Sequence, residues 1–307
     1  MAQNSSKKRV VAKTQVKSVA IKKTPQKKAS ANQAISKKNS MKKSAKKVVH
    51  KESKSLTALE QAIQLHHEGR LKEAWTSYQS VLKVDPRHFL AVHSMGLIAV
   101  QMKNYQMAED LFKMACEFEP GNAKAFNNLA NAYLSLGKND LALKNYDLAL
   151  RLENGYIDAL KNRGILYAGT HQPQKALADF QQALKLNPGN IELHSSIANV
   201  YITEARYEDA LQEYEKALKI APKSAVLMNN IGVVLCSVKR FKEALEYFTK
   251  ATQINQEYAE ALNNRAVALM NLNEYAKAMA DYEKAIALSP AYADALQGLA
   301  RARRFLK

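Results

Sequence analysis

The hydrophobic positions of this chain recur with a fixed period of 34 residues. In seven consecutive blocks an alanine stands at the same place, an aromatic residue follows four positions later, and three positions further on comes an alanine, or a valine in the first block. Residues spaced by three and four lie on one face of an α-helix, so each block predicts a helix with a buried stripe. The aligned alanines are Ala74, Ala108, Ala142, Ala176, Ala210, Ala244 and Ala278.

Two further features of the period predict a second helix in each block. The position twelve residues before each aligned alanine is always alanine or glycine, which suits a close helix crossing. Five blocks carry proline near their end, where it terminates a helix because it lacks the backbone N–H. We therefore expect hairpins with helices at positions 1–14 and 15–31 of blocks 55–88, 89–122, 123–156, 157–190, 191–224, 225–258 and 259–292.

This arrangement of small, aromatic and proline positions resembles the tetratricopeptide repeat (TPR) family. The resemblance covers residues 55–292 and implies an all-α fold, a right-handed α-solenoid of seven 34-residue helical hairpins. Residues 293–307 repeat the apolar pattern once more and then become basic, so we expect a C-terminal capping helix there. The related pentatricopeptide repeat reads RNA bases, but its usual longer period and basic inner face do not match this nearly neutral repeat body.

The charge of the chain is concentrated at its N-terminus. Residues 1–55 hold 17 Lys and Arg and one acid, Glu52, whereas the other residues hold 29 bases and 27 acids. Residues 1–54 contain no aromatic residue and no glycine, so we expect a disordered Lys-rich basic tail, similar in composition to histone-like tails. Its candidate polyanion-binding residues are Lys7, Lys8, Arg9, Lys22, Lys23, Lys27, Lys28, Lys37, Lys38, Lys42, Lys43, Lys46 and Lys47.

The tail leaves several partners open. Nucleic acid is one, and an anionic membrane surface, a nuclear-import receptor and no partner at all (an inert spacer) are the others. The chain has two cysteines, too few for a disulfide framework, and no apolar run approaching the roughly 18 residues of a membrane span. These features favour a cytoplasmic protein, with a nuclear or nucleoid location as the alternative.

The sequence offers no recognisable catalytic chemistry. Phosphate-binding loops, nucleophile elbows and metal-binding histidine or cysteine pairs are absent, and most glycines fit the repeat scheme. We therefore expect no enzyme, no cofactor and no metal site.

In TPR proteins the first helices line the concave surface through positions 2, 5, 6, 9, 12 and 13 of each repeat. Repeats 1 and 2 present an apolar groove there, suited to an amphipathic helix, a Leu-rich peptide or self-association: Leu56, Leu59, Ile63, Leu90, Leu97 and Val100. Repeats 3 to 7 present candidate peptide-binding residues, nearly all asparagine: Asn127, Asn128, Asn131, Lys161, Asn162, Asn199, Asn229, Asn230, Asn263 and Asn264.

The asparagines have two interpretations. Asparagine inside a helix costs roughly 0.5–0.7 kcal/mol relative to alanine, and its amide offers the donor and acceptor that an extended peptide backbone needs. The pattern resembles the asparagine ladder of O-linked N-acetylglucosamine transferases; the alternative is a set of solvated residues multiplied by repeat duplication. The carboxylate clamp of chaperone-binding repeats is incomplete, although Lys124, Lys161 and Asn162 remain candidates for holding an acidic group.

The sequence thus predicts a non-enzymatic interaction scaffold, adaptor or chaperone that binds an extended polypeptide, with a cationic tail that tethers it to polyanions. The alternative is a chromatin- or nucleoid-associated protein whose tail binds DNA or RNA and whose repeats recruit partners.

Overall fold

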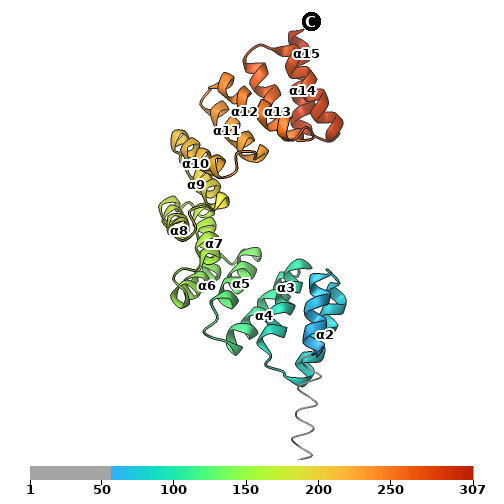
Figure 1. The fold of residues 1–307 in the computed structure, drawn as a ribbon, viewed down its shortest axis with the longest axis vertical. Helices are drawn as coiled ribbons and strands as arrows, with labels where there is room; N and C mark the ends of the chain where they lie inside the picture. The colour runs from blue at the N-terminus through green and yellow to red at the C-terminus, as the bar shows by residue number, and fades with distance from the viewer. Residues whose placement is uncertain (1–56, 307) are drawn as a thin grey trace, which may run out of the picture. The chain divides into compact units, whose positions relative to one another are not determined.

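The computed structural model describes residues 57–306, and all the regular structure in this range is helical. Consecutive helices pack against one another in chain order, which confirms the all-α solenoid (Figure 1). A first helix spans 57–67. It is followed by α2 (Leu71–Val84), α3 (Phe89–Gln101), α4 (Tyr105–Phe118), α5 (Ala123–Ser135), α6 (Asn139–Leu152), α7 (Ile157–Gly169), α8 (Pro173–Leu186), α9 (Ile191–Thr203), α10 (Tyr207–Ile220), α11 (Ala225–Ser237), α12 (Phe241–Ile254), α13 (Ala259–Asn271), α14 (Tyr275–Leu288) and α15 (Ala293–Phe305). The predicted basic tail and Leu56 lie outside the described residues.

The turn between the two helices of each repeat lies where the second helix was expected to begin. Position 15 has a positive φ in all seven repeats, although only two of these residues are glycine: Gly69, Lys103, Gly137, His171, Ala205, Lys239 and Asn273. The following backbone N–H bonds back five residues, as in Asn104 to the Ala99 carbonyl at 2.9 Å, which is the Schellman end of a helix. The expected start at position 15 was therefore wrong, and the second helices start at position 17.

Proline marks the end of the second helices but does not determine it. Helices α6 and α12 end at the same repeat position as the others, at Leu152 and Ile254, although Asn154 and Gln256 stand where proline was expected. Proline is therefore compatible with the end of the second helix but is not required for it.

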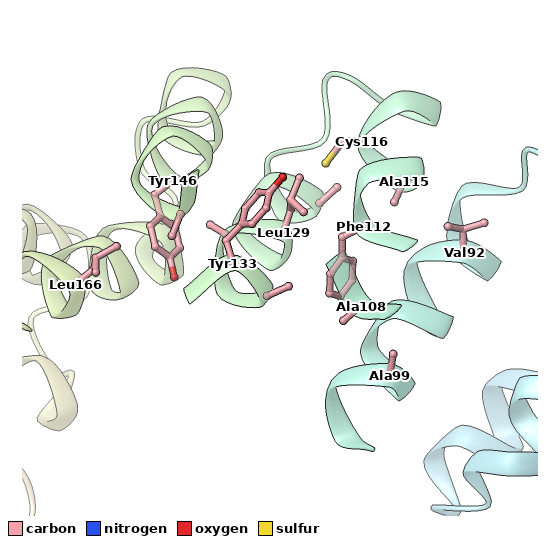
Figure 2. Packing of buried hydrophobic residues seen from close by; sticks show 14 residues of the cluster. Val92, Ala99, Ala108, Phe112, Ala115, Cys116, Leu129, Tyr133, Tyr146 and Leu166 are labelled. Carbon is pink, nitrogen blue, oxygen red and sulfur yellow. The ribbon is translucent and has the colours of Figure 1, made fainter. Parts of the chain in front are cut away.

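The buried core consists of the repeated small and aromatic positions. Figure 2 shows one section, where the Phe112 ring lies among small side chains such as Ala99 and Ala108. Aromatic type and crossing residue alternate strictly from repeat to repeat. Tyr78, Tyr146, Tyr214 and Tyr282 accompany alanine sixteen residues earlier, whereas Phe112, Phe180 and Phe248 accompany Gly96, Gly164 and Gly232. A Cβ at Gly164 would lie 2.6 Å from a Phe180 ring carbon, so the phenylalanine rings occupy the space of the missing side chain.

Candidate peptide-binding face

The side chains at positions 2, 5, 6, 9, 12 and 13 of the first helices are called the first-helix face below. Its asparagines differ widely in exposure. Asn127, Asn229 and Asn263, all at position 5, are 3%, 0% and 6% exposed. Asn128, Asn131, Asn162, Asn230 and Asn264 are half-buried, and Asn199 is exposed. They are therefore not one uniform solvated row.

Many of these amides bond to the neighbouring first helix. The Asn162 Nδ2 group on α7 donates to Asn127 Oδ1 on α5 at 3.1 Å. Asn264 Nδ2 on α13 donates to Asn229 Oδ1 on α11 at 3.0 Å. In both pairs position 6 of one repeat donates to position 5 of the repeat before it. This cross-helix bonding was not anticipated from the sequence, and it uses part of the hydrogen-bonding capacity assigned to a ligand.

In repeat 2 a histidine, His93, occupies position 5, where repeats 3, 6 and 7 carry asparagine. Asn128 Nδ2 lies 2.9 Å from His93 Nε2, and His93 is 4% exposed between neighbouring aromatic rings. Burial lowers the pKa of His93 to about 4, with the charge of Lys124 acting in the same direction. His93 is therefore neutral at pH 7, and its Nε2 accepts the Asn128 hydrogen bond.

Asn131 and Asn162 form a cluster with a buried tyrosine. The Tyr146 hydroxyl on α6 donates to Asn131 Oδ1 at 2.6 Å, and Asn162 Nδ2 donates to the same oxygen at 3.2 Å. These two bonds saturate Asn131 Oδ1 and leave its Nδ2 group without a partner in the described structure. Asn162 uses its Nδ2 group for both asparagines, and its Oδ1 has no partner within residues 57–306. A free donor and a free acceptor thus lie side by side.

The same arrangement recurs two repeats later. The Tyr214 hydroxyl on α10 donates to Asn199 Oδ1 at 2.7 Å, with the same spacing of 15 residues as Tyr146 and Asn131. Burial raises the pKa of both tyrosines, so both stay protonated as donors. Asn199 is exposed, and its Nδ2 group likewise has no partner within the described residues. The spacing of asparagine and tyrosine is the sequence signal that identifies these two amides among the ten candidates.

Two residues limit the predicted anion site. Lys161 Nζ already pairs with Glu192 of α9 at 3.0 Å, so its charge is neutralised within the chain. Lys124 is exposed, with no ion pair in the described residues. Of the two lysines, Lys161 is thus engaged in an ion pair, and only Lys124 keeps an unpaired charge within residues 57–306.

Aliphatic side chains occupy the remaining places on the face. In repeats 1 and 2, Leu59, Ile63, Leu97 and Val100 are half-buried against the core, and Leu90 is 40% exposed. Position 9 carries Asn131 and Asn199 in repeats 3 and 5 and exposed aliphatic residues in repeats 4, 6 and 7. These are Ile165, Val233 and Val267, which are 45%, 41% and 39% exposed.

The charged groups inside the repeats serve packing. Arg163 on α7 forms a two-pronged pair with Asp179 on α8, at 2.8 and 2.7 Å, and Arg265 repeats this with Asp281 at 2.6 Å. Burial raises the pKa of Cys116 to about 12 and of Cys236 to about 11, so neither thiol is activated. Within residues 57–306 no group of three His, Cys, Asp or Glu side chains is arranged to hold a metal. No helix in that range is long and apolar enough to cross a bilayer.

Three family models described as tetratricopeptide repeat match residues 111–144, 157–190 with 259–292, and 189–257, together more than half of the chain. No curated protein sequence matches this chain.

Solved structures with the same fold are distant in sequence. A tetratricopeptide repeat protein from Parabacteroides merdae aligns with a TM-score of 0.64 and 18% identity, over 82% of this chain and 99% of that one. The C-terminal part of a repeat protein from Cytophaga hutchinsonii gives a TM-score of 0.63 and 14% identity, over 78% and 99%. The Cut9–Hcn1 hetero-tetramer of the APC/C aligns with a TM-score of 0.59 and 17% identity, over 78% of this chain and 48% of that one. These likenesses show the fold.

Proposed function

We propose that this chain, which belongs to the tetratricopeptide repeat family, is a protein–protein interaction scaffold whose first-helix face binds an extended polypeptide through its backbone. The observation that carries the proposal is the pair of unused groups beside Tyr146, the Asn131 Nδ2 donor and the Asn162 Oδ1 acceptor. A peptide backbone offers one carbonyl acceptor and one N–H donor per residue, so it can satisfy both groups. Neither catalysis nor a cofactor is needed for this role.

The spacing of the free amides suits an extended segment. Asn131 and Asn199 lie two repeats apart, on α5 and α9. Packed helices are about 8–10 Å apart, so the two amides are roughly 20 Å apart along the face. An extended chain advances about 3.3 Å per residue and covers this distance with about six residues. Ile165 lies between them and is 45% exposed, so it provides an apolar contact for a ligand side chain.

The test replaces the donors while keeping the internal hydrogen bonds. In the variant Asn131→Asp with Asn199→Asp, each side chain keeps the oxygen that accepts from Tyr146 or Tyr214 but loses its N–H groups. The probes are two uncharged, fluorescently labelled 15-residue peptides of the same composition and scrambled sequence. Both should bind wild-type protein alike. The variant should weaken both by about 5- to 150-fold, since each lost hydrogen bond is worth about 0.5–1.5 kcal/mol.

The control variant is Asn145→Asp, which makes the same change on the second helix α6, where the side chain bonds to its own helix carbonyl at Leu141. It should leave the affinity for both peptides unchanged. Equal anisotropy titrations for wild type and the double variant would refute the proposal. A strong preference for one scrambled sequence would show that side chains, and not the backbone, are recognised.

The charge distribution supports a second role for residues 1–54. Their cationic side chains contrast with a repeat body of 29 bases and 27 acids, so we expect an electrostatic attraction to nucleic acid to come from this segment. Binding to random-sequence DNA should weaken with salt at a slope of about −0.9 in log K per phosphate neutralised. Removal of residues 1–54 should abolish the binding. An affinity that survives the deletion, or that is insensitive to salt, would place nucleic acid on the repeats.

A further inference from the structure

A cavity of about 500 Å³ lies at the C-terminal end of the first-helix face, between α13, α14 and α15. Its lining combines polar and aromatic groups, notably Tyr282, Asp294, Gln297, Arg301 and the neighbouring rings of Tyr275 and Phe305. None of these residues was among the candidates from the sequence.

Gly298 creates the polar end of the cavity. It takes position 6 of the last helix, where other repeats carry a polar side chain such as Asn162 or Asn264. A Cβ here would lie 2.3 Å from a Tyr282 ring carbon and 2.8 Å from its hydroxyl oxygen, so the tyrosine occupies this space. The absent side chain also leaves Asn263 Oδ1 as a buried acceptor without a partner in the described residues, unlike Asn127 and Asn229 in earlier repeats.

Tyr282 is the buried polar group of this site. Tyr282 is only 3% exposed, and its hydroxyl has no hydrogen-bond partner in the described structure. The hydroxyls of Tyr146 and Tyr214, by contrast, both donate to asparagine. Position 9 of its own repeat is Val267 and position 6 of the next is Gly298, so neither of these two positions offers a polar side chain to Tyr282. The Arg301 charge lies close enough to oppose the effect of burial on the Tyr282 pKa.

The cavity carries a positive and a negative side chain at different points along α15. Arg301 and Asp294 both line it and are seven residues apart on α15, or about 10 Å at 1.5 Å per residue. Neither forms an ion pair within residues 57–306. One end of the cavity thus offers the Arg301 guanidinium and the Tyr282 hydroxyl, both donors, while the other offers an acceptor. Arg303, two residues from Arg301, is by contrast paired with Glu283.

We propose that this cavity binds a carboxylate of an extended peptide, held by Arg301 and the Tyr282 hydroxyl, with a backbone N–H of the same peptide donating to Asp294. The site deepens the proposed function, because it lies on the first-helix face and fixes the direction of the bound chain. A carboxylate accepts from both donors at once, and charge-assisted bonds to arginine are the strong class. The carboxylate is supplied either by the C-terminus of the ligand or by a Glu or Asp side chain.

The experiment uses full-length protein labelled with ¹³C at methionine methyl groups, because Met270 lines the cavity and the other methionines are internal references. Three acetylated tetrapeptides are titrated: Ala-Leu-Ala-Ala with a free C-terminus, the same peptide as an amide, and an amide with Glu in third place. At least one carboxylate peptide should shift the Met270 signal saturably, and the plain amide should bind at least tenfold more weakly. The better of the two carboxylate peptides identifies the source.

Two variants test the named groups. Tyr282→Phe places at this position the residue that repeats 2, 4 and 6 carry, and Arg301→Gln removes the charge; each should weaken the carboxylate peptide at least tenfold. Arg303→Gln, a matched loss of charge on the same helix, should leave binding unchanged. Equal binding of acid and amide peptides, wild-type affinity in both variants, or no Met270 shift with any peptide would overturn the proposal. The Asn131 and Asn199 variants test the proposed function separately, since those residues do not line this cavity.

Discussion

Replacing Gly164 by alanine tests how tightly the repeat core is packed. The new Cβ would lie 2.6, 2.9 and 3.0 Å from three ring carbons of Phe180, whereas ordinary carbon contacts begin near 3.4 Å. Phe180 is 1% exposed and is enclosed by buried residues of its own and the neighbouring repeats, among them Leu160 and Ile197. Its ring therefore cannot shift away from the new Cβ without contacting these side chains. Overpacking of this kind costs about 1–3 kcal/mol, offset by about 1 kcal/mol from the better helix propensity of alanine.

The expected net effect of Gly164→Ala is a loss of about 1 kcal/mol, or about 2–4 °C in melting temperature for a body of this size. Gly169 provides a control on the same helix α7, because no atom lies within 4 Å of a Cβ placed there. Gly169→Ala should therefore leave stability unchanged or raise it by up to about 1 kcal/mol. Both are measured by thermal melting followed by circular dichroism at 222 nm.

A double-mutant cycle separates the clash from other causes. Phe180→Leu shortens the side chain opposite Gly164, so the double variant should be more stable than the sum of the two single changes predicts. Additive effects, or a Gly164→Ala variant as stable as the Gly169→Ala variant, would show that the ring has room to move and would refute the packing argument.

Two further predictions concern the first-helix face. His93 has a folded pKa of about 4 against an ordinary value of 6.5, so the unfolded state binds more protons between these values and stability falls as pH drops through this window, by about 3 kcal/mol in total. In His93→Gln the slope of the unfolding free energy against pH between pH 6 and 5, measured by urea titration, should decrease by nearly one proton. An unchanged slope would exclude His93 as its source. Asn229→Ala should destabilise by about 1 kcal/mol or more because it removes the acceptor for Asn264. Asn263→Ala should cost less, because it removes an unpaired buried oxygen together with only a long bond of 3.4 Å from its Nδ2 group to Asn264. Equal losses in the two urea titrations would contradict the assigned hydrogen bonds.

Much of the fold was predictable because the repeated pattern depends on contacts between residues three and four positions apart in one helix. The spacing of alanine, aromatic and small residues places one helical stripe in each block, and the same spacing identified Gly96, Gly164 and Gly232 as crossing positions. The turn was less predictable. Glycine and, less often, asparagine favour the left-handed conformation that ends a helix, and Gly69, Gly137 and Asn273 fit this rule. Lys103, Ala205 and Lys239 adopt the same conformation, and nothing in their residue types revealed the turn.

The candidate site was only partly predictable. The sequence selected the asparagines by type and position, but it treated them as equivalent. Their hydrogen bonds join residues 31 and 35 positions apart, as in Asn162 with Asn131 and Asn127, and depend on how neighbouring first helices rotate against each other. The C-terminal cavity was missed because its defining residue, Gly298, has no side chain and its buried tyrosine belongs to another helix.

The sequence by itself thus determined the number, order and buried stripe of the helices, since these follow from contacts between residues three and four apart. It also located the cationic charge at the N-terminus, which is a matter of composition. Only the tertiary structure decided which amides are used internally and which remain free, because one asparagine side chain has two donors and two acceptors and the packed neighbours select among them. Tyr146 and Tyr214 donate to Asn131 and Asn199 and so leave the amide N–H groups of these asparagines free within the described residues. Tyr282 meets Gly298, which has no side chain to bond its hydroxyl.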